Sequence, residues 1–263
     1  MGYAIYQNSK IDNTEHKKES TKKEKTTPKK AQKIDKKASN KIDKTKDKKS
    51  TTTKKTKPKE LDLKKRLKAL NAKLGDRVFL RIFKKEETLE VWIKPKRAKK
   101  YKFLKSYKIC KYSGTLGPKL KEGDYQAPEG FYKVYKGSLN PHSKFHLSFN
   151  LGYPNRYDRA HKRTGSFLMV HGECASIGCY AMGNKNIEEI YLLVKKALYA
   201  GQKGVWVHIF PFRLTRKNLA KYKNNKWYNF WQNLKEGYDI FEKTKIPPII
   251  GVKNKRYKVR ARF

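Results

Sequence analysis

The chain is organised around the stretch FLMVHGECASIGCYAM, residues 167–182. Its first four residues are apolar, which predicts a short buried strand that ends at His171. A loop containing two glycines leads from this histidine to Cys179, eight residues further on. Because this loop is long enough to fold back, we expect the Cys179 thiol to lie within hydrogen-bond reach of the His171 imidazole.

These two side chains have the chemistry of a nucleophile and its base. A free thiol has a pKa of about 8.5, so little thiolate exists at neutral pH unless a neighbouring base removes the proton. An imidazole can remove that proton and later return it to a leaving amine. The alternative is a structural cysteine packed beside a histidine. We favour catalysis because a serine and a glycine share the loop with the pair.

Gly178 and Ser176 are expected to shape this loop. A glycine before the nucleophile permits a tight turn, which would leave the amides of Cys179 and Tyr180 free to bind a developing oxyanion. Ser176 would orient the loop or His171, or would simply belong to the turn. The predicted catalytic group is therefore Cys179, His171, Ser176 and Gly178, with two backbone amides as oxyanion donors.

The string SIGC at 176–179 resembles the S-x-G-C nucleophile motif of the L,D-transpeptidase (YkuD-type) catalytic domain. Further strings resemble the YafK branch of this family and follow one another in the same order. They are VFLRIFK at 78–84, EGDYQAPEGFY at 122–132, NP at 140–141, NLGYPN at 150–155, YDRA at 157–160 and VHIFPFR at 207–213. The resemblance runs from about Val78 to near the C-terminus.

This resemblance implies a mainly β (α+β) fold, a β-sandwich with short helices. It also implies a cysteine enzyme that acts on peptidoglycan stem peptides at a meso-diaminopimelate residue through a Cys179 thioester. It implies a periplasmic or cell-envelope location and no small-molecule cofactor. Some YafK-type members hydrolyse, releasing an outer-membrane lipoprotein linked through its lysine, so the acceptor stays open between an amine and water. An L,D-carboxypeptidase and a delivered antibacterial cell-wall effector stay open as alternatives.

Three charged residues are candidates for substrate binding. Stem peptides carry free carboxylates, which a guanidinium fork binds better than an ammonium does. Arg159 and Arg163 come just before the catalytic strand, so either could clamp a carboxylate, although a solvated charged loop is the alternative. Glu129 lies in an irregular stretch rich in Gly and Pro, the 113–130 loop, where it could meet a substrate amine or brace the loop.

The charge balance is strongly basic, with 66 Lys and Arg against 23 Asp and Glu and a net charge of +43. Much of the excess lies in residues 1–60, the Lys-rich arm, whose low apolar content predicts disorder. Residues 10–60 could bind an anionic polymer, such as nucleic acid, lipopolysaccharide or acidic lipid, or could form a solvated spacer. Polyanion binding through this arm is the non-enzymatic alternative for the whole chain.

Residues 1–10 contain no apolar segment of the ~7–15 residues that a secretory signal needs. No stretch approaches the ~20 apolar residues of a membrane span. The three cysteines show no disulfide framework, and we expect Cys110 to be a small packed hydrophobe. No spacing of Cys and His is typical of a metal site, so no metal is expected.

The pattern divides the chain into the arm, a short helix and linker at 61–76, a catalytic domain at 77–213, and a C-terminal helical extension with a terminal strand at 214–263. Period-two alternation predicts a hairpin of 77–83 with 88–93. Further strands are expected at 101–112, 131–135, 144–151 and 205–210. Helices are expected from Asn186 to Gly201 and over 215–246, followed by a strand or hairpin over 249–259.

Overall fold

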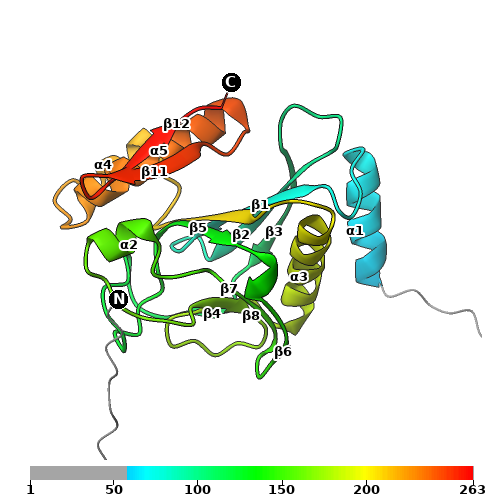
Figure 1. Cartoon of the computed structure of the whole chain (residues 1–263), viewed down its shortest axis with the longest axis horizontal. Coiled ribbons are helices and arrows are strands. Elements are labelled where there is room, and N and C mark those ends of the chain that lie inside the picture. Colours follow the sequence, from blue (N-terminus) through cyan, green and yellow to red (C-terminus); the bar gives the residue numbers. More distant parts are fainter. Residues whose placement is uncertain (1–57, 263) are drawn as a thin grey trace, which may run out of the picture. The chain divides into compact units, whose positions relative to one another are not determined.

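The protein is described here from a computed structural model, in which residues 58–262 are placed (Figure 1). The predictions made for the Lys-rich arm, up to residue 57, and for the start of the chain lie outside these residues. Among the helices that the structure describes, none is long and apolar enough to cross a membrane. Helix α1 (Pro58–Ala69) opens this part of the chain.

The first sheet has five strands in the order β3-β2-β1-β10-β5. Their bounds are Lys102–Lys108 for β3, Thr88–Lys94 for β2, Arg77–Phe83 for β1, Val205–Phe210 for β10 and Gly130–Val134 for β5. Strands β1 and β2 pair antiparallel with Arg77 opposite Lys94, which confirms the predicted hairpin. Strand β1 pairs with β10 in parallel, and both are almost wholly buried because they lie inside the sheet.

The second sheet contains strands of the stretch 167–182 and has the order β4-β9-β8-β7-β6. Its strands are β4 (Lys111–Tyr112), β9 (Tyr180–Ala181), β8 (Met169–His171), β7 (His146–Asn150) and β6 (Leu139–Ser143). The strand expected over 101–112 is therefore two strands, β3 and β4, in different sheets. The break falls at Ile109 and Cys110, where the Cys110 amide donates to the Ala181 carbonyl at 2.8 Å.

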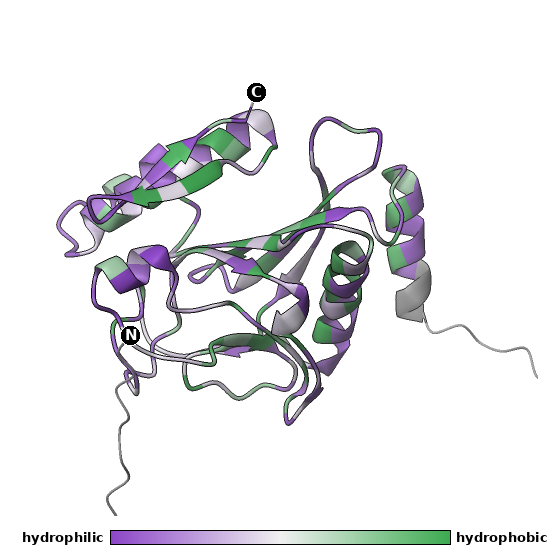
Figure 2. Ribbon diagram, viewed as in Figure 1, coloured by the Kyte–Doolittle hydropathy of each residue, from purple (hydrophilic) through white to green (hydrophobic). Residues whose placement is uncertain are grey.

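Helix α3 (Asn184–Tyr199) shares one hydrophobic core with both sheets (Figures 1 and 2). Its buried residues Ile187, Ile190 and Val194 recur at helical spacing and lie in the same cluster as residues of β1 and β8. The predicted helix is confirmed, but it begins two residues before Asn186, with Gly183 as its N-cap. The observed fold is mixed α+β and leans to β, as predicted.

The C-terminal residues form a second core against the other side of the first sheet. Helices α4 (Arg216–Ala220) and α5 (Tyr228–Thr244) replace the single helical span predicted over 215–246, and the hairpin of β11 (Ile249–Lys253) with β12 (Arg256–Arg260) follows them. Trp231 and Tyr238 of α5 pack here with Phe83 of β1 and Phe210 of β10. The short helices α2 (Arg156–Ala160) and η1 (Lys136–Ser138) were not predicted.

A buried ion pair connects strand β1, the 113–130 loop and helix α5. The Lys84 ammonium lies 3.1 Å from Glu129 Oε1, and both side chains are fully buried. Lys84 also donates to the carbonyls of Thr115, Gly117 and Ala127 at 2.7, 2.9 and 3.0 Å. Glu129 accepts the Gly117 amide at 2.6 Å and the Trp231 indole N–H at 2.8 Å. The pair therefore fixes the 113–130 loop between β1 and α5.

We expect Glu129→Gln to lower the free energy of unfolding by about 3–5 kcal/mol, because it leaves the Lys84 charge buried without a counter-charge. Urea denaturation followed by circular dichroism measures the change. Asp239→Asn is the control, since it breaks a more exposed pair with Lys235 and should cost no more than about 0.5 kcal/mol. Equal losses in the two variants would contradict the role given to the buried pair.

Candidate active site

Strands β8 and β9 bring Cys179 and His171 to one face of the second sheet. They pair in parallel with Val170 opposite Tyr180 and His171 opposite Ala181. Cys179, just before β9, therefore lies beside Met169, and side chains two residues apart on a strand share a face. Its Sγ accepts the Met169 amide at 3.4 Å and lies 3.7 Å from the Phe167 carbonyl. Within the part of the chain that is described, the thiol bonds to these backbone groups and not to the imidazole.

The imidazole of His171 is held in one orientation. Its Nδ1 lies 2.6 Å from the Gly172 carbonyl oxygen. A carbonyl oxygen can only accept, so Nδ1 carries the proton and Nε2 keeps the lone pair that a base needs. The ring of Phe145 packs against the imidazole, with 4.8 Å between the two ring centres, and His171 is only 2% exposed.

Burial makes both reactive groups neutral. It lowers the pKa of His171, and the Gly172 hydrogen bond and the Glu173 charge oppose this only in part. Burial also raises the pKa of Cys179, against the Met169 hydrogen bond and the positive charge of Lys119. Both effects favour the uncharged form. The resting pair is therefore a thiol and a neutral imidazole.

Ser176 and Gly178 shape the loop before the nucleophile, the nucleophile loop (residues 172–178). The Ser176 hydroxyl donates to the Cys179 carbonyl at 2.8 Å and accepts the Gly178 amide at 3.3 Å. Gly178 has φ +132, a backbone conformation that favours glycine. Of the three roles considered for Ser176, these contacts support holding the loop or forming its turn, and neither contact involves His171.

The two predicted oxyanion donors differ in their surroundings. Within the described residues, the Cys179 amide has no hydrogen-bond acceptor. Tyr180 opens β9, which is paired on both sides, with Val170 and Tyr112 as its register partners. The Cys179 amide is therefore the better placed donor, and a role for the Tyr180 amide stays a prediction.

A disulfide between Cys110 and Cys174 corrects the prediction that Cys110 is a packed hydrophobe. The two cysteines are 64 residues apart in sequence, and their Cα atoms lie 5.4 Å apart. Pairing of β4 with β9 brings Cys110 beside the nucleophile loop, which carries Cys174. No spacing in the sequence could show this, because the partners meet only across the sheet. The disulfide ties the nucleophile loop to the β3–β4 connection and leaves Cys179 as the free cysteine.

Two of the three candidate substrate-binding residues, Glu129 and Arg163, are buried, and for Glu129 the contacts support the alternative that it braces the loop. Glu129 is fully buried, with its oxygens bonded to Lys84, Gly117 and Trp231. Arg163 is 7% exposed and donates to the Asp158 carboxylate at 2.8 Å.

Both buried groups form contacts that brace the fold. The third candidate, Arg159, is exposed at the surface and donates to the Pro154 carbonyl. Its role as a carboxylate clamp stays a prediction.

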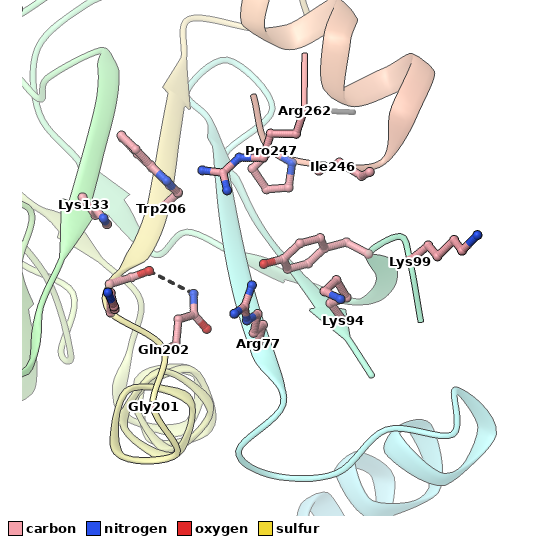
Figure 3. Close-up of a pocket in the computed structure, with 13 residues that line it drawn as sticks. Arg77, Lys94, Lys99, Lys133, Gly201, Gln202, Trp206, Ile246, Pro247 and Arg262 are labelled. Atoms are coloured by element: carbon pink, nitrogen blue, oxygen red, sulfur yellow. Dashed lines mark hydrogen bonds between the residues drawn. The ribbon is translucent and has the colours of Figure 1, made fainter. Parts of the chain in front are cut away.

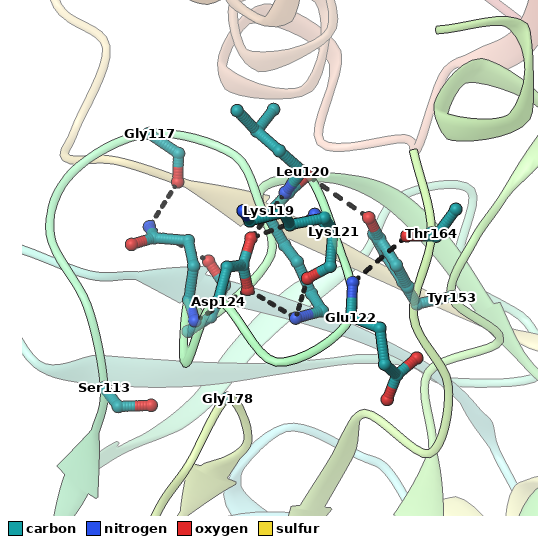
Figure 4. A network of polar contacts seen from close by, with 12 residues as sticks. Ser113, Gly117, Lys119, Leu120, Lys121, Glu122, Asp124, Tyr153, Thr164 and Gly178 are labelled. Atoms are coloured by element: carbon teal, nitrogen blue, oxygen red, sulfur yellow. Dashed lines mark hydrogen bonds and ion pairs between the residues drawn. The ribbon is translucent and has the colours of Figure 1, made fainter. Parts of the chain in front are cut away.

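The 113–130 loop borders the nucleophile loop and supplies contacts that the sequence did not indicate (Figure 4). Lys119 is 3% exposed and pairs with Asp124 at 2.5 Å. The same carboxylate accepts the Leu120 amide at 2.8 Å. A Cβ on Gly178 would lie 3.7 Å from the Gln126 carbonyl oxygen, which shows how closely the two loops approach. Lys119 thus places a fixed positive charge near the thiol.

Comparison with known proteins identifies close relatives. The L,D-transpeptidase catalytic domain family, YkuD, matches residues 77–209. Proteins of Escherichia coli K12 and O157:H7 that are assigned as the L,D-transpeptidase YafK are 50% identical over 186 residues, covering 71% of this chain and 75% of theirs.

Two solved structures show weaker likeness. The helical cell shape determining protein Pgp2 from Campylobacter jejuni has a TM-score of 0.41 at 22% identity, covering 69% of this chain and 67% of its own. Bd1075 of Bdellovibrio bacteriovorus has a TM-score of 0.37 at 17% identity, covering 68% and 78%.

We expect thiol counting to reveal the disulfide. The sequence has 3 cysteines, so protein denatured without reductant should take up iodoacetamide at Cys179 alone, and reduced protein at all 3, as read by mass spectrometry. The Cys110→Ser/Cys174→Ser variant should lose about 4 kcal/mol of stability, the chain-entropy value for a loop of this length. Cys179→Ala is the control and should show no label before reduction. Labelling of Cys110 or Cys174 in the unreduced protein would contradict the bond.

We expect native Cys179 to be alkylated by iodoacetamide only at alkaline pH. Its pKa is raised, so the thiolate forms above the ordinary value of about 8.5. The rate of labelling at pH 5–10 measures this midpoint without interference from the bonded cysteines. A rate that is already at its plateau near pH 6 would show a preformed thiolate–imidazolium pair and would contradict the neutral resting state.

Proposed function

Because this chain belongs to the L,D-transpeptidase catalytic domain family, which acts on peptidoglycan, we propose that Cys179 opens an amide bond at the diaminopimelate centre of stem peptides. The observation that carries this proposal is the free Cys179 thiol on one face with His171, whose Nδ1–H is fixed by the Gly172 carbonyl. Peptidoglycan stem peptides are then its substrates.

The first half of the reaction forms a thioester. As Cys179 Sγ attacks the amide carbon, His171 Nε2 takes the thiol proton, and the carbonyl oxygen gains a negative charge. The Cys179 amide, which has no acceptor among the described residues, can donate to that oxygen. The tetrahedral intermediate collapses, the C–N bond breaks, and His171 returns the proton to the departing amine.

The second half regenerates the thiol. An amine or a water attacks the thioester carbon while the neutral His171 takes its proton, and the proton then passes to the departing sulfur. An amine acceptor gives transfer and water gives hydrolysis, with no other difference in the steps. Release of a lipoprotein linked through lysine is the hydrolytic case. Phe167 and Ile177 flank the nucleophile and are 74% and 76% exposed, which suits an aliphatic side chain beside the reacting centre.

The disulfide supports a location in the cell envelope. Disulfides persist in oxidising compartments such as the bacterial periplasm and are rare in the cytosol. Cys110 and Cys174 are both exposed in the structure, so a reducing compartment would have access to the bond. An enzyme that acts on the wall must also reach it. We therefore propose the periplasm as the compartment of the folded protein.

The test is to incubate the full chain with diaminopimelate-containing muropeptides, a lysine-linked lipoprotein fragment and a free amine, and to identify products by mass spectrometry. We expect Cys179→Ala to lower product formation by at least about 10³-fold, as loss of a nucleophile does. Cross-linked products that need Cys179 establish transfer. Hydrolysis is established if the bond to the lipoprotein lysine is cleaved, or a terminal D-residue is released, and no cross-linked product forms. The absence of any product that depends on Cys179 would overturn the proposal.

A further inference from the structure

A cavity of about 390 Å³ lies away from the catalytic stretch, where the first sheet meets the end of the described chain (Figure 3). None of the residues that line it belongs to the sheet containing His171. Six of them are cationic, and they come from separate segments of the chain. They are Arg77, Lys94, Lys99, Lys133, Lys203 and Arg262.

These charges are not balanced within the cavity. Its lining contains no Asp or Glu. Arg77 and Lys94 are direct register partners across β1 and β2, and like charges in that position destabilise a sheet. Lys94 donates to the Ala98 carbonyl at 2.7 Å. Among the described residues, the guanidinium groups of Arg77 and Arg262 have neither a hydrogen bond nor an ion pair.

The floor of the cavity is rigidly built. The Gln202 side-chain amide accepts the Val78 N–H at 2.8 Å and donates to the carbonyls of Val78 and Gly204 at 2.8 and 3.0 Å. The Lys133 ammonium lies 5.4 Å from the ring centre of Trp206. Gln202 thus joins the start of β1 to the start of β10, which fixes the position of Arg77.

The cavity also has aromatic walls. Trp206 and Tyr101 are both half-buried within it. Burial raises the pKa of Tyr101, and the charges of Arg77 and Arg262 oppose that effect, so both guanidinium groups act on this hydroxyl. A ligand would therefore meet two guanidinium forks beside aromatic rings.

A second hollow continues the basic surface. It shares Arg77 and Lys94 with the cavity and adds Lys73 and Lys96. The one acid in its lining, Asp76, is 8% exposed and accepts the Lys73 amide at 2.9 Å. The positive potential thus extends beyond the cavity. Convergent charges of one sign in a concave site raise the local concentration of counter-ions.

We propose that this cavity is a binding site for a phosphate-bearing group. A phosphate ester carries about −1.5 to −2 charges at neutral pH and three acceptor oxygens, so it balances several cations at once. Arginine forks match phosphate in a bidentate geometry. The volume admits more than a single ion and suits a phosphorylated saccharide or the headgroup of an anionic lipid. The site does not depend on the proposed catalysis.

The test compares two double variants of the full chain that lose the same charge. Arg77→Gln/Arg262→Gln removes both guanidinium groups from the cavity. Arg156→Gln/Arg216→Gln removes two exposed arginines elsewhere. Both proteins keep the Lys-rich arm, so its contribution cancels. Binding of inorganic pyrophosphate is measured by isothermal titration calorimetry, and flotation with phosphatidylglycerol vesicles, against phosphatidylcholine vesicles, tests the lipid source.

We expect the cavity variant to bind at least one probe about tenfold more weakly than wild type, which corresponds to the loss of a charge-assisted hydrogen bond. The surface variant should change by less than about twofold. A loss for pyrophosphate assigns a soluble phosphate, and a loss for vesicles alone assigns a lipid headgroup. Equal losses in both variants, or no loss in the cavity variant, would overturn the site.

A second cavity variant, Lys99→Gln/Lys203→Gln, covers the case in which the arginine variant fails to fold. Circular dichroism checks the fold of each protein. Lys99 and Lys203 are exposed and, among the described residues, have no hydrogen bond or ion pair, so their replacement removes charge without breaking a contact. Weaker binding is expected here also, and binding equal to that of the surface variant would count against the site.

Discussion

The buried pair of Lys84 and Glu129 is the constraint on which the site depends. Removing two charges from water is costly, and their attraction repays the cost only when the remaining donors and acceptors are satisfied. Here three carbonyls receive the ammonium, and the carboxylate accepts N–H groups of Gly117 and Trp231. Burial lowers the pKa of Lys84, and the charge of Glu129 opposes that effect. The 113–130 loop is thereby fixed, and with it Lys119 near the thiol.

Two restraints act on the nucleophile loop from different sides. The disulfide holds Cys174 to Cys110, and the Ser176 hydroxyl closes the turn on Cys179. Neither restraint touches the imidazole, whose tautomer is set by the contact of Nδ1 with the Gly172 carbonyl. The thiol is therefore placed by covalent and turn geometry, whereas its protonation is set by burial. In the mechanism proposed above, the sulfur of this neutral pair stays a thiol until a substrate carbonyl is present for it to attack.

The sequence predicts those features that depend on local pattern. Period-two alternation located β1 and β2, and helical spacing located α3. The apolar run and the motif predicted His171 and Cys179 as candidate site residues, and the structure places both on one face of the second sheet. The sequence does not predict contacts between residues that are far apart in the chain and meet only in the folded structure. Arg163 looks solvated in its polar segment, yet Asp158 and aromatic rings enclose it. Cys110 has no local sign of its partner 64 residues away. Long-range contacts, and not local secondary-structure propensity, determine the surroundings of Arg163 and Cys110.

The cations on and beside strand β1 differ in whether they are buried and in whether a carboxylate pairs with them. It carries Arg81, which is 1% exposed and lies 2.8 Å from Glu242, and it leads into Lys84, which is paired with Glu129. Burial forces such pairing, because an isolated charge in the interior is too costly. Arg77 begins the same strand at the edge of the cavity, where water reaches it and no carboxylate of the described chain pairs with it. The fold neutralises the cations it buries and leaves this one free to meet an anion from outside.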